Sequence, residues 1–294
     1  MKWVSVLGGL ACAAALCGGS GGGCGGGSGG STGGGSTGGG SGGGTSGGGT
    51  TGGAQPYGGF VIFGVLNEAG VAVYSGQAGF YATYPPFSCA GGTQQGSCCY
   101  ETAAAAQAFG KTVPAPSVPA GAVTLLDGTA TLANLHFVSG TGYSPASSTQ
   151  SNTITWNPGD SLGVTVAGDP SGVAAFSATV TAPAPLAGVS PTLATLASLS
   201  RTSDFTLSWT GSPPGTVTLN LDAVSTSGSD GEIICSAPGG SGSLDVAAAL
   251  LGNFQSGDHA SLLLTVANQV SPTVANASVG VSAENQVQVS TTVQ

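Results

Sequence analysis

Basic residues are nearly missing from this chain of 294 residues. It has three, Lys2, Lys111 and Arg201, against twelve Asp and Glu, and charged residues make up 5% of the sequence. So few cations cannot neutralise a nucleic-acid backbone, and they offer little attraction to an anionic membrane surface. The composition therefore argues against nucleic acid as a partner and leaves a covalent lipid anchor as the route to a membrane.

Catalytic motifs are missing as well. The sequence has no S-x-x-K or H-E-x-x-H pattern, and its G-x-S-x-G matches lie in a glycine tract without the strand and helix that such a motif needs. His136 and His259 are the two histidines, so a Ser-His-Asp triad would need one of them. We predict that the protein is not an enzyme and uses no cofactor or metal. A secreted hydrolase built on His259 is a remote alternative.

The N-terminus has the layout of an export signal. One positive charge at Lys2 precedes the small, apolar stretch VSVLGGLACAAALC (4–17), which is too short to span a bilayer comfortably. This segment is compatible with a plain secretory signal and with a lipoprotein signal. For lipidation Cys17 is the first candidate, although Leu16 precedes it directly, and Cys12 is the second, with Gly9 where an aliphatic residue is typical. We predict an exported protein, either an outer-membrane or cell-surface lipoprotein or a secreted one.

Residues 18–53 are almost entirely Gly, Ser and Thr. Such a segment cannot bury a core and is expected to behave as a disordered linker. Its root-mean-square reach is roughly 33 Å, which is enough to hold a domain away from a membrane surface.

The rest of the chain predicts an all-β fold. Short apolar runs rich in β-branched and aromatic residues alternate with turn residues, as in GFVIFGVL (59–66), TATLANLHFV (129–138), DFTLSW (204–209) and TVTLNLD (216–222). The Pro-rich stretch 183–191 indicates a boundary between two consecutive antiparallel β-sandwich domains, 54–184 and 185–294. Alternation places Trp156 and Trp209 on core faces. Asp245–Gly252 predicts a short helix with an acidic N-cap.

The body also resembles a known group of proteins. The segments LSWTG, TVTLNL, IICSAPGGSGSLDVAAALL and ASLLLTVAN, within 207–268, look like the C-terminal Ig-like domain of uncharacterised exported lipoproteins of myxobacterial-type bacteria. WNPGDSLGVTVAG (156–168) and VAAFSATVTAP (173–183) look like the domain that precedes it. The resemblance covers most of 57–294. It implies a cell-envelope location and a β-sandwich, and it carries over no catalytic residue.

Four of the seven cysteines lie in the body: Cys89, Cys98, Cys99 and Cys235. In an exported domain they predict two disulfides with three possible connectivities. If the strand is extended, Cys98 and Cys99 point to opposite faces, and a bond between these neighbours ranks last. We prefer Cys89–Cys98 with Cys99–Cys235. No C-x-x-C pair supports a zinc site.

Two functions remain in view. The first is a structural or interaction module of the cell envelope without chemistry of its own. The second is a module that binds carbohydrate or another envelope polymer through the aromatic stretch around Tyr81, Tyr84 and Phe87, because sugars stack on exposed rings. The predicted partner is an unknown protein or polysaccharide of the cell surface.

Overall fold

The computed structural model describes residues 57–68, 71–82, 89, 92–102, 117–138, 142–145, 154–225 and 228–294. The predicted signal segment (1–17), the predicted linker (18–53) and the lipidation candidates Cys12 and Cys17 lie outside these residues. The described residues form an all-β body, as predicted. None of the helices within these ranges is both long and apolar enough to cross a membrane.

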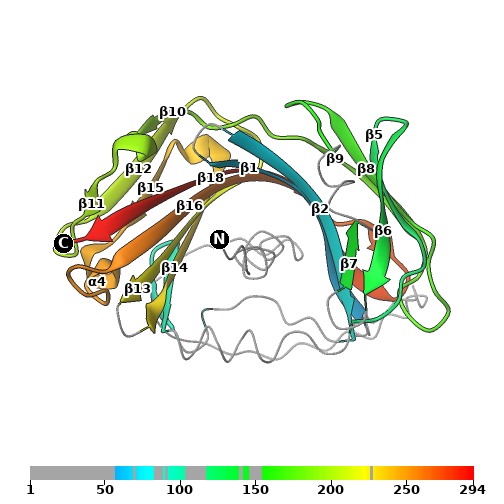
Figure 1. The fold of residues 1–294 in the computed structure, drawn as a ribbon, viewed down its shortest axis with the longest axis horizontal. Coiled ribbons are helices and arrows are strands. Elements are labelled where there is room, and N and C mark those ends of the chain that lie inside the picture. Colours follow the sequence, from blue (N-terminus) through cyan, green and yellow to red (C-terminus); the bar gives the residue numbers. More distant parts are fainter. Residues whose placement is uncertain are drawn as a thin grey trace, which may run out of the picture.

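Most strands belong to one 15-stranded sheet whose strands bend together into an arch (Figure 1). Its main path runs β3 (Thr93–Gln95), β4 (Cys98–Thr102), β14 (Gly228–Pro238), β13 (Thr216–Ser225), β16 (His259–Val270), β18 (Ala277–Val293), β1 (Tyr57–Glu68), β2 (Val71–Tyr81), β7 (Gly142–Pro145), β6 (Ala130–Val138), β5 (Val123–Asp127), β8 (Ser161–Val166) and β9 (Phe176–Thr181). Two short strands, β11 (Ser198–Leu199) and β17 (Thr273–Val274), pair with β18 beside this path.

A three-stranded sheet covers the outer side of the arch at one end (Figure 1). It consists of β10 (Ala187–Ser190), β12 (Phe205–Thr210) and β15 (Ser243–Val246), and the connecting segments include the 3₁₀ turns η1 (Leu193–Thr195) and η2 (Gly239–Ser241) and the helix α4 (Ala248–Leu251).

The described residues form two large apolar cores, one toward each end of the arch. The first core contains Phe63, Phe80, Leu125, Trp156 and Leu162, and the second contains Leu207, Trp209, Leu219, Leu221 and Ile233. In the strands of both cores, period-2 alternation points every second side chain into the core. The core positions of Trp156 and Trp209 are therefore confirmed. The indole Nε1 of Trp209 donates a hydrogen bond to the Gly239 carbonyl at 2.8 Å.

The strand β18 belongs to both cores. Val279 and Val281 pack in the first core, whereas Val287, Val289 and Val293 pack in or against the second. The first core thus takes side chains from residues beyond 185, and the two cores do not coincide with the segments 54–184 and 185–294. One 17-residue strand runs through 277–293.

Not every pairing is antiparallel. The first strand of the body, β1, runs parallel to β18 in a continuous register from Tyr57 opposite Ala277 to Asn67 opposite Val287. β11 is parallel to β18 as well. The prediction that all sheets are antiparallel was therefore wrong. The sequence does not show that the first and the last strand of the body pair with each other.

The predicted helix is shorter than expected. Asp245 lies in β15, where its carboxylate accepts a hydrogen bond from the Thr206 hydroxyl at 2.6 Å, and α4 starts at Ala248. The acidic group at the start of α4 comes instead from Asp204, whose Oδ1 accepts from the Ala248 N–H at 2.7 Å. An acceptor 44 residues away in sequence has replaced the local cap.

Candidate functional site

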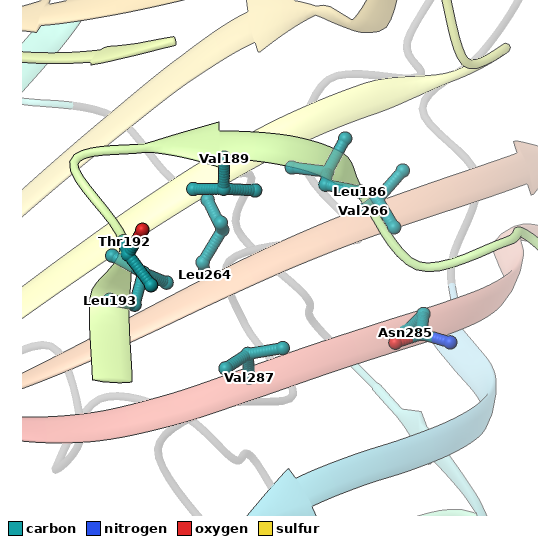
Figure 2. Close-up of a pocket in the computed structure, with 8 residues that line it drawn as sticks. All are labelled: Leu186, Val189, Thr192, Leu193, Leu264, Val266, Asn285 and Val287. Carbon is teal, nitrogen blue, oxygen red and sulfur yellow. The ribbon is translucent and has the colours of Figure 1, made fainter. Parts of the chain in front are cut away.

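A pocket of about 240 Å³ lies between the small sheet and the large sheet (Figure 2). Its lining residues come from the β10 region, η1, β16 and β18, and they are Leu186, Val189, Thr192, Leu193, Leu264, Val266, Asn285 and Val287. Six of these eight side chains are aliphatic, two are uncharged and polar, and none carries a charge. The pocket therefore suits an uncharged, mainly apolar group.

Asn285 is a polar lining residue whose side chain is fixed by a hydrogen bond. It is 7% exposed and lies on the same face of β18 as Val287 and Val289, in phase with the core valines. Asn67 Nδ2 on the neighbouring strand donates to Asn285 Oδ1 at 3.1 Å and to the Gln286 carbonyl at 3.2 Å. Sequence reasoning missed Asn285, although a polar residue in phase with core valines is a signal that could have found it.

The opposite face of β18, which we call the inner face of the arch, carries a hydrogen-bonded polar row. The Ser282 hydroxyl donates to Glu284 Oε1 at 3.0 Å, and Gln286 Nε2 donates to Glu284 Oε2 at 2.7 Å. All three residues are buried, and burial raises the pKa of Glu284 to about 7. Both carboxylate oxygens are thus engaged within the row.

Three more carboxylates lie side by side on the inner face. Glu232 on β14 is opposite Glu101 on β4 and opposite Asp222 on β13. Burial raises the pKa of Glu101, and burial with the nearby charges of Asp222 and Glu101 raises the pKa of Glu232. Asn220 Nδ2 donates a short hydrogen bond to Glu232 Oε1. Among the described residues, no group of three or more His, Cys, Asp or Glu is placed to hold a metal ion.

Two disulfides fasten the β4 end of the large sheet. Cys98 joins Cys235 and Cys89 joins Cys99, with Cα–Cα distances of 4.0 and 5.8 Å. The prediction of two bonds among these four cysteines is confirmed. The preferred pairing, Cys89–Cys98 with Cys99–Cys235, was wrong.

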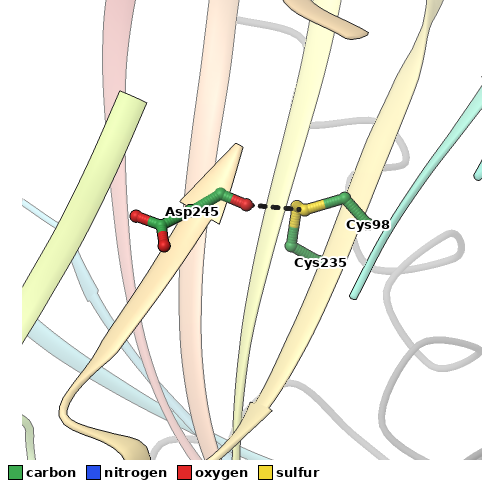
Figure 3. Close-up of a disulfide and its surroundings, with 3 residues drawn as sticks. All are labelled: Cys98, Cys235 and Asp245. Atoms are coloured by element: carbon green, nitrogen blue, oxygen red, sulfur yellow. Dashed lines mark hydrogen bonds between the residues drawn. A yellow bond between two sulfur atoms is a disulfide. The ribbon is translucent and has the colours of Figure 1, made fainter. Parts of the chain in front are cut away.

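Strand register explains the actual pairing. Cys98 and Cys235 are directly opposite each other on β4 and β14, and both side chains are buried in the second core. Cys99 points to the other face, as alternation requires, and meets Cys89 there. Alternation in the sequence correctly predicts that Cys98 and Cys99 lie on opposite faces, but it does not give the register between β4 and β14. One sulfur of the buried disulfide, Cys98 Sγ, lies 3.2 Å from the Asp245 carbonyl of β15, so this bond touches both sheets (Figure 3).

The two histidines are exposed. His136 lies on β6, and His259 is the first residue of β16, opposite Val224 and Thr292. The preceding Asp258 is buried and accepts a hydrogen bond from the Gln255 N–H at 2.7 Å. Within the described ranges, the structure brings neither histidine into a hydrogen-bonded triad with a serine and an aspartate.

The predicted aromatic surface is only partly described. Tyr81 is buried in a small cluster with Phe60 and Ile62, and its ring centroid lies 6.2 Å from that of Phe60. The ring of Tyr81 is therefore not an exposed platform for a sugar. Tyr84 and Phe87 lie outside the described residues, so their role stays a prediction.

No protein-family model matches this chain, and no curated protein matches it either.

Proposed function

We propose that this chain is a non-catalytic interaction module of the bacterial cell envelope, exported and held at the surface by a lipid on Cys17 or Cys12. We further propose that the part around the second core is an Ig-like sandwich of the exported lipoprotein type. Its partner in this proposal is a protein or polysaccharide of the cell surface.

The observation that carries the proposal is the disulfide-fastened body behind a predicted tether. Cys98–Cys235 and Cys89–Cys99 are compatible with an oxidising compartment. Two inner-face carboxylates are engaged in hydrogen bonds, Glu284 with Ser282 and Gln286, and Glu232 with Asn220. Such a body serves better as a rigid platform than as a reaction site.

Intact mass of the protein isolated from membranes tests this proposal. We expect a diacyl or triacyl increment on a chain that begins at Cys17 or Cys12. Reduction should add the mass of four hydrogen atoms, because two disulfides open. An unmodified N-terminus on protein found in the medium would overturn the anchoring. Turnover of ester or glycoside substrates, lost in a His259→Ala variant, would overturn the non-catalytic assignment.

Polymer binding is the second candidate, and the inner face favours it. Asp222 on β13 is exposed and lies opposite the half-buried Ser261 on β16, whose hydroxyl accepts a 2.9 Å hydrogen bond from the half-buried Gln288 on β18. Hydroxyl, amide and carboxylate groups on adjacent strands match the donors and acceptors of a sugar chain. Because Tyr81 is buried, this surface is the better candidate for a sugar-binding site.

Co-sedimentation with insoluble peptidoglycan, cellulose and chitin tests the second candidate. Depletion of the wild-type protein by one polymer, and retention in solution of an Asp222→Ala/Gln288→Ala variant, would support it. A matched control is Asp127→Ala/Gln255→Ala, which changes the same residue types elsewhere. Equal sedimentation of both variants would exclude this surface.

A further inference from the structure

We propose that the pocket between β10–η1 and the β16–β18 pair binds a small, neutral, mainly aliphatic molecule that carries one hydrogen-bond acceptor, and that the Asn285 amide N–H recognises that acceptor. The proposal does not depend on lipid anchoring or on the partner of the module.

The orientation of the Asn285 amide follows from its neighbour. Asn67 contacts the Gln286 carbonyl, which can only accept, so the contacting atom of Asn67 must be its nitrogen. The same nitrogen meets Asn285, so the atom that Asn285 presents to it is the oxygen. Asn285, which is one of the lining residues, therefore keeps Nδ2 as its donor, and this atom has no hydrogen-bond partner among the described residues. Asn285 Nδ2 is not among the described side-chain atoms that are both buried and unpaired, so it keeps contact with solvent, and an acceptor on the ligand would take the place of water there.

The size of the pocket limits the ligand. Benzene occupies an engineered apolar cavity of about 150 Å³, or roughly 25 Å³ for each non-hydrogen atom. At that density the pocket of about 240 Å³ holds roughly nine or ten non-hydrogen atoms. The branched walls of Leu186, Val189 and Leu264 suit an aliphatic body rather than a polar one.

The charge of the ligand follows from the lining, which contains no basic or acidic side chain. Arg201, the one described basic residue, is engaged with the Gly252 carbonyl at 3.0 Å. A carboxylate in the pocket would lose its water without gaining a cation. The recognised head group is therefore a neutral acceptor such as an amide, ester or alcohol oxygen.

Octanamide and octanoate make a matched probe pair, because they share size and chain length and differ in charge. Titration of the full chain, followed by calorimetry and by ligand-observed NMR, should show saturable binding of octanamide. Octanoate at pH 8 should bind at least about tenfold more weakly, because its charge is desolvated without a partner.

Variants locate the site. Val189→Phe fills the pocket from its half-buried rim, and we expect it to weaken octanamide binding by about tenfold or more. Val224→Phe makes the same change at an exposed strand position and should leave binding within about twofold. The pair Asn67→Ala/Asn285→Ala removes the donor together with the side chain that contacts Asn285 Oδ1, and should also weaken binding.

Thermal melts of each variant establish that it is folded before it is titrated. Saturable octanamide binding that is lost in Val189→Phe and kept in Val224→Phe supports the proposal. Absence of octanamide binding at millimolar concentration, equal binding of octanoate, or unchanged binding in folded Val189→Phe would overturn it. Unchanged binding in the folded Asn67→Ala/Asn285→Ala protein would overturn the role of Asn285.

Discussion

Removal of the Cys98–Cys235 disulfide should destabilise the protein more than removal of the Cys89–Cys99 disulfide. Cys98 and Cys235 are 137 residues apart in sequence, whereas Cys89 and Cys99 are 10 apart. The chain-entropy model gives about 5 kcal/mol for the long loop and about 2.7 kcal/mol for the short one. The expected difference is therefore about 2 kcal/mol in the free energy of unfolding.

Urea unfolding of two double variants, Cys98→Ala/Cys235→Ala and Cys89→Ala/Cys99→Ala, measures this difference under non-reducing conditions, which keep the remaining disulfide of each variant intact. Comparison of their slopes with that of the wild type shows whether the denatured state of each variant has expanded, as loss of a long cross-link requires. An equal loss of stability in the two variants, or a larger loss for the short loop, would refute the reasoning from loop length. The buried bond would then act through local packing between β4, β14 and β15.

Three further outcomes are expected. Trp209→Phe should cost about 1–3 kcal/mol in the free energy of unfolding, because the buried Gly239 carbonyl loses its donor; denaturant titration measures it. Asp204→Ala should cost about 0.5–2 kcal/mol, because the Ala248 N–H at the start of α4 loses its acceptor; Asp204→Asn, which keeps an acceptor oxygen, is the control. Burial raises the pKa of Glu284 from 4.5 to about 7, so the folded state holds a proton that the unfolded chain releases between these values. Stability should therefore fall by about 3 kcal/mol as pH rises through this window, and Glu284→Gln should flatten the profile.

A different outcome would contradict each of these three predictions. Trp209→Phe with wild-type stability would mean that the indole hydrogen bond contributes nothing net. Equal losses for Asp204→Ala and Asp204→Asn would assign the effect to something other than the hydrogen bond to α4. A Glu284→Gln protein whose stability still falls between pH 4.5 and 7 would place the responsible proton on another group, with Glu101 and Glu232 the next to test.

The strand positions could be predicted well where one face of a strand is buried. In 205–210, Leu207 and Trp209 are buried while Thr206 and Thr210 are exposed, which is the pattern that the sequence displays directly. Segments without this alternation were missed. β4 begins with two cysteines and is buried at four successive positions, and β15 was read as the start of a helix.

The candidate sites were harder to predict, because they depend on which strands become neighbours. Tyr81 looks like an accessible ring in a Pro-rich stretch, but the pairing of β1 with β2 brings it against Phe60. Asn285 and Asn67 are 218 residues apart in sequence, and only the parallel register of β1 and β18 makes them partners.

The sequence by itself determined the all-β class, the core role of both tryptophans and the presence of two disulfides among four cysteines. These follow from local properties: residue preference, period-2 alternation and cysteine count. Only the tertiary structure decided which cysteines join, that β18 serves both cores, and that an uncharged pocket forms beneath β10. Each of these depends on strand register and on the packing of one sheet against another, and a period-2 pattern is compatible with many registers and many neighbours.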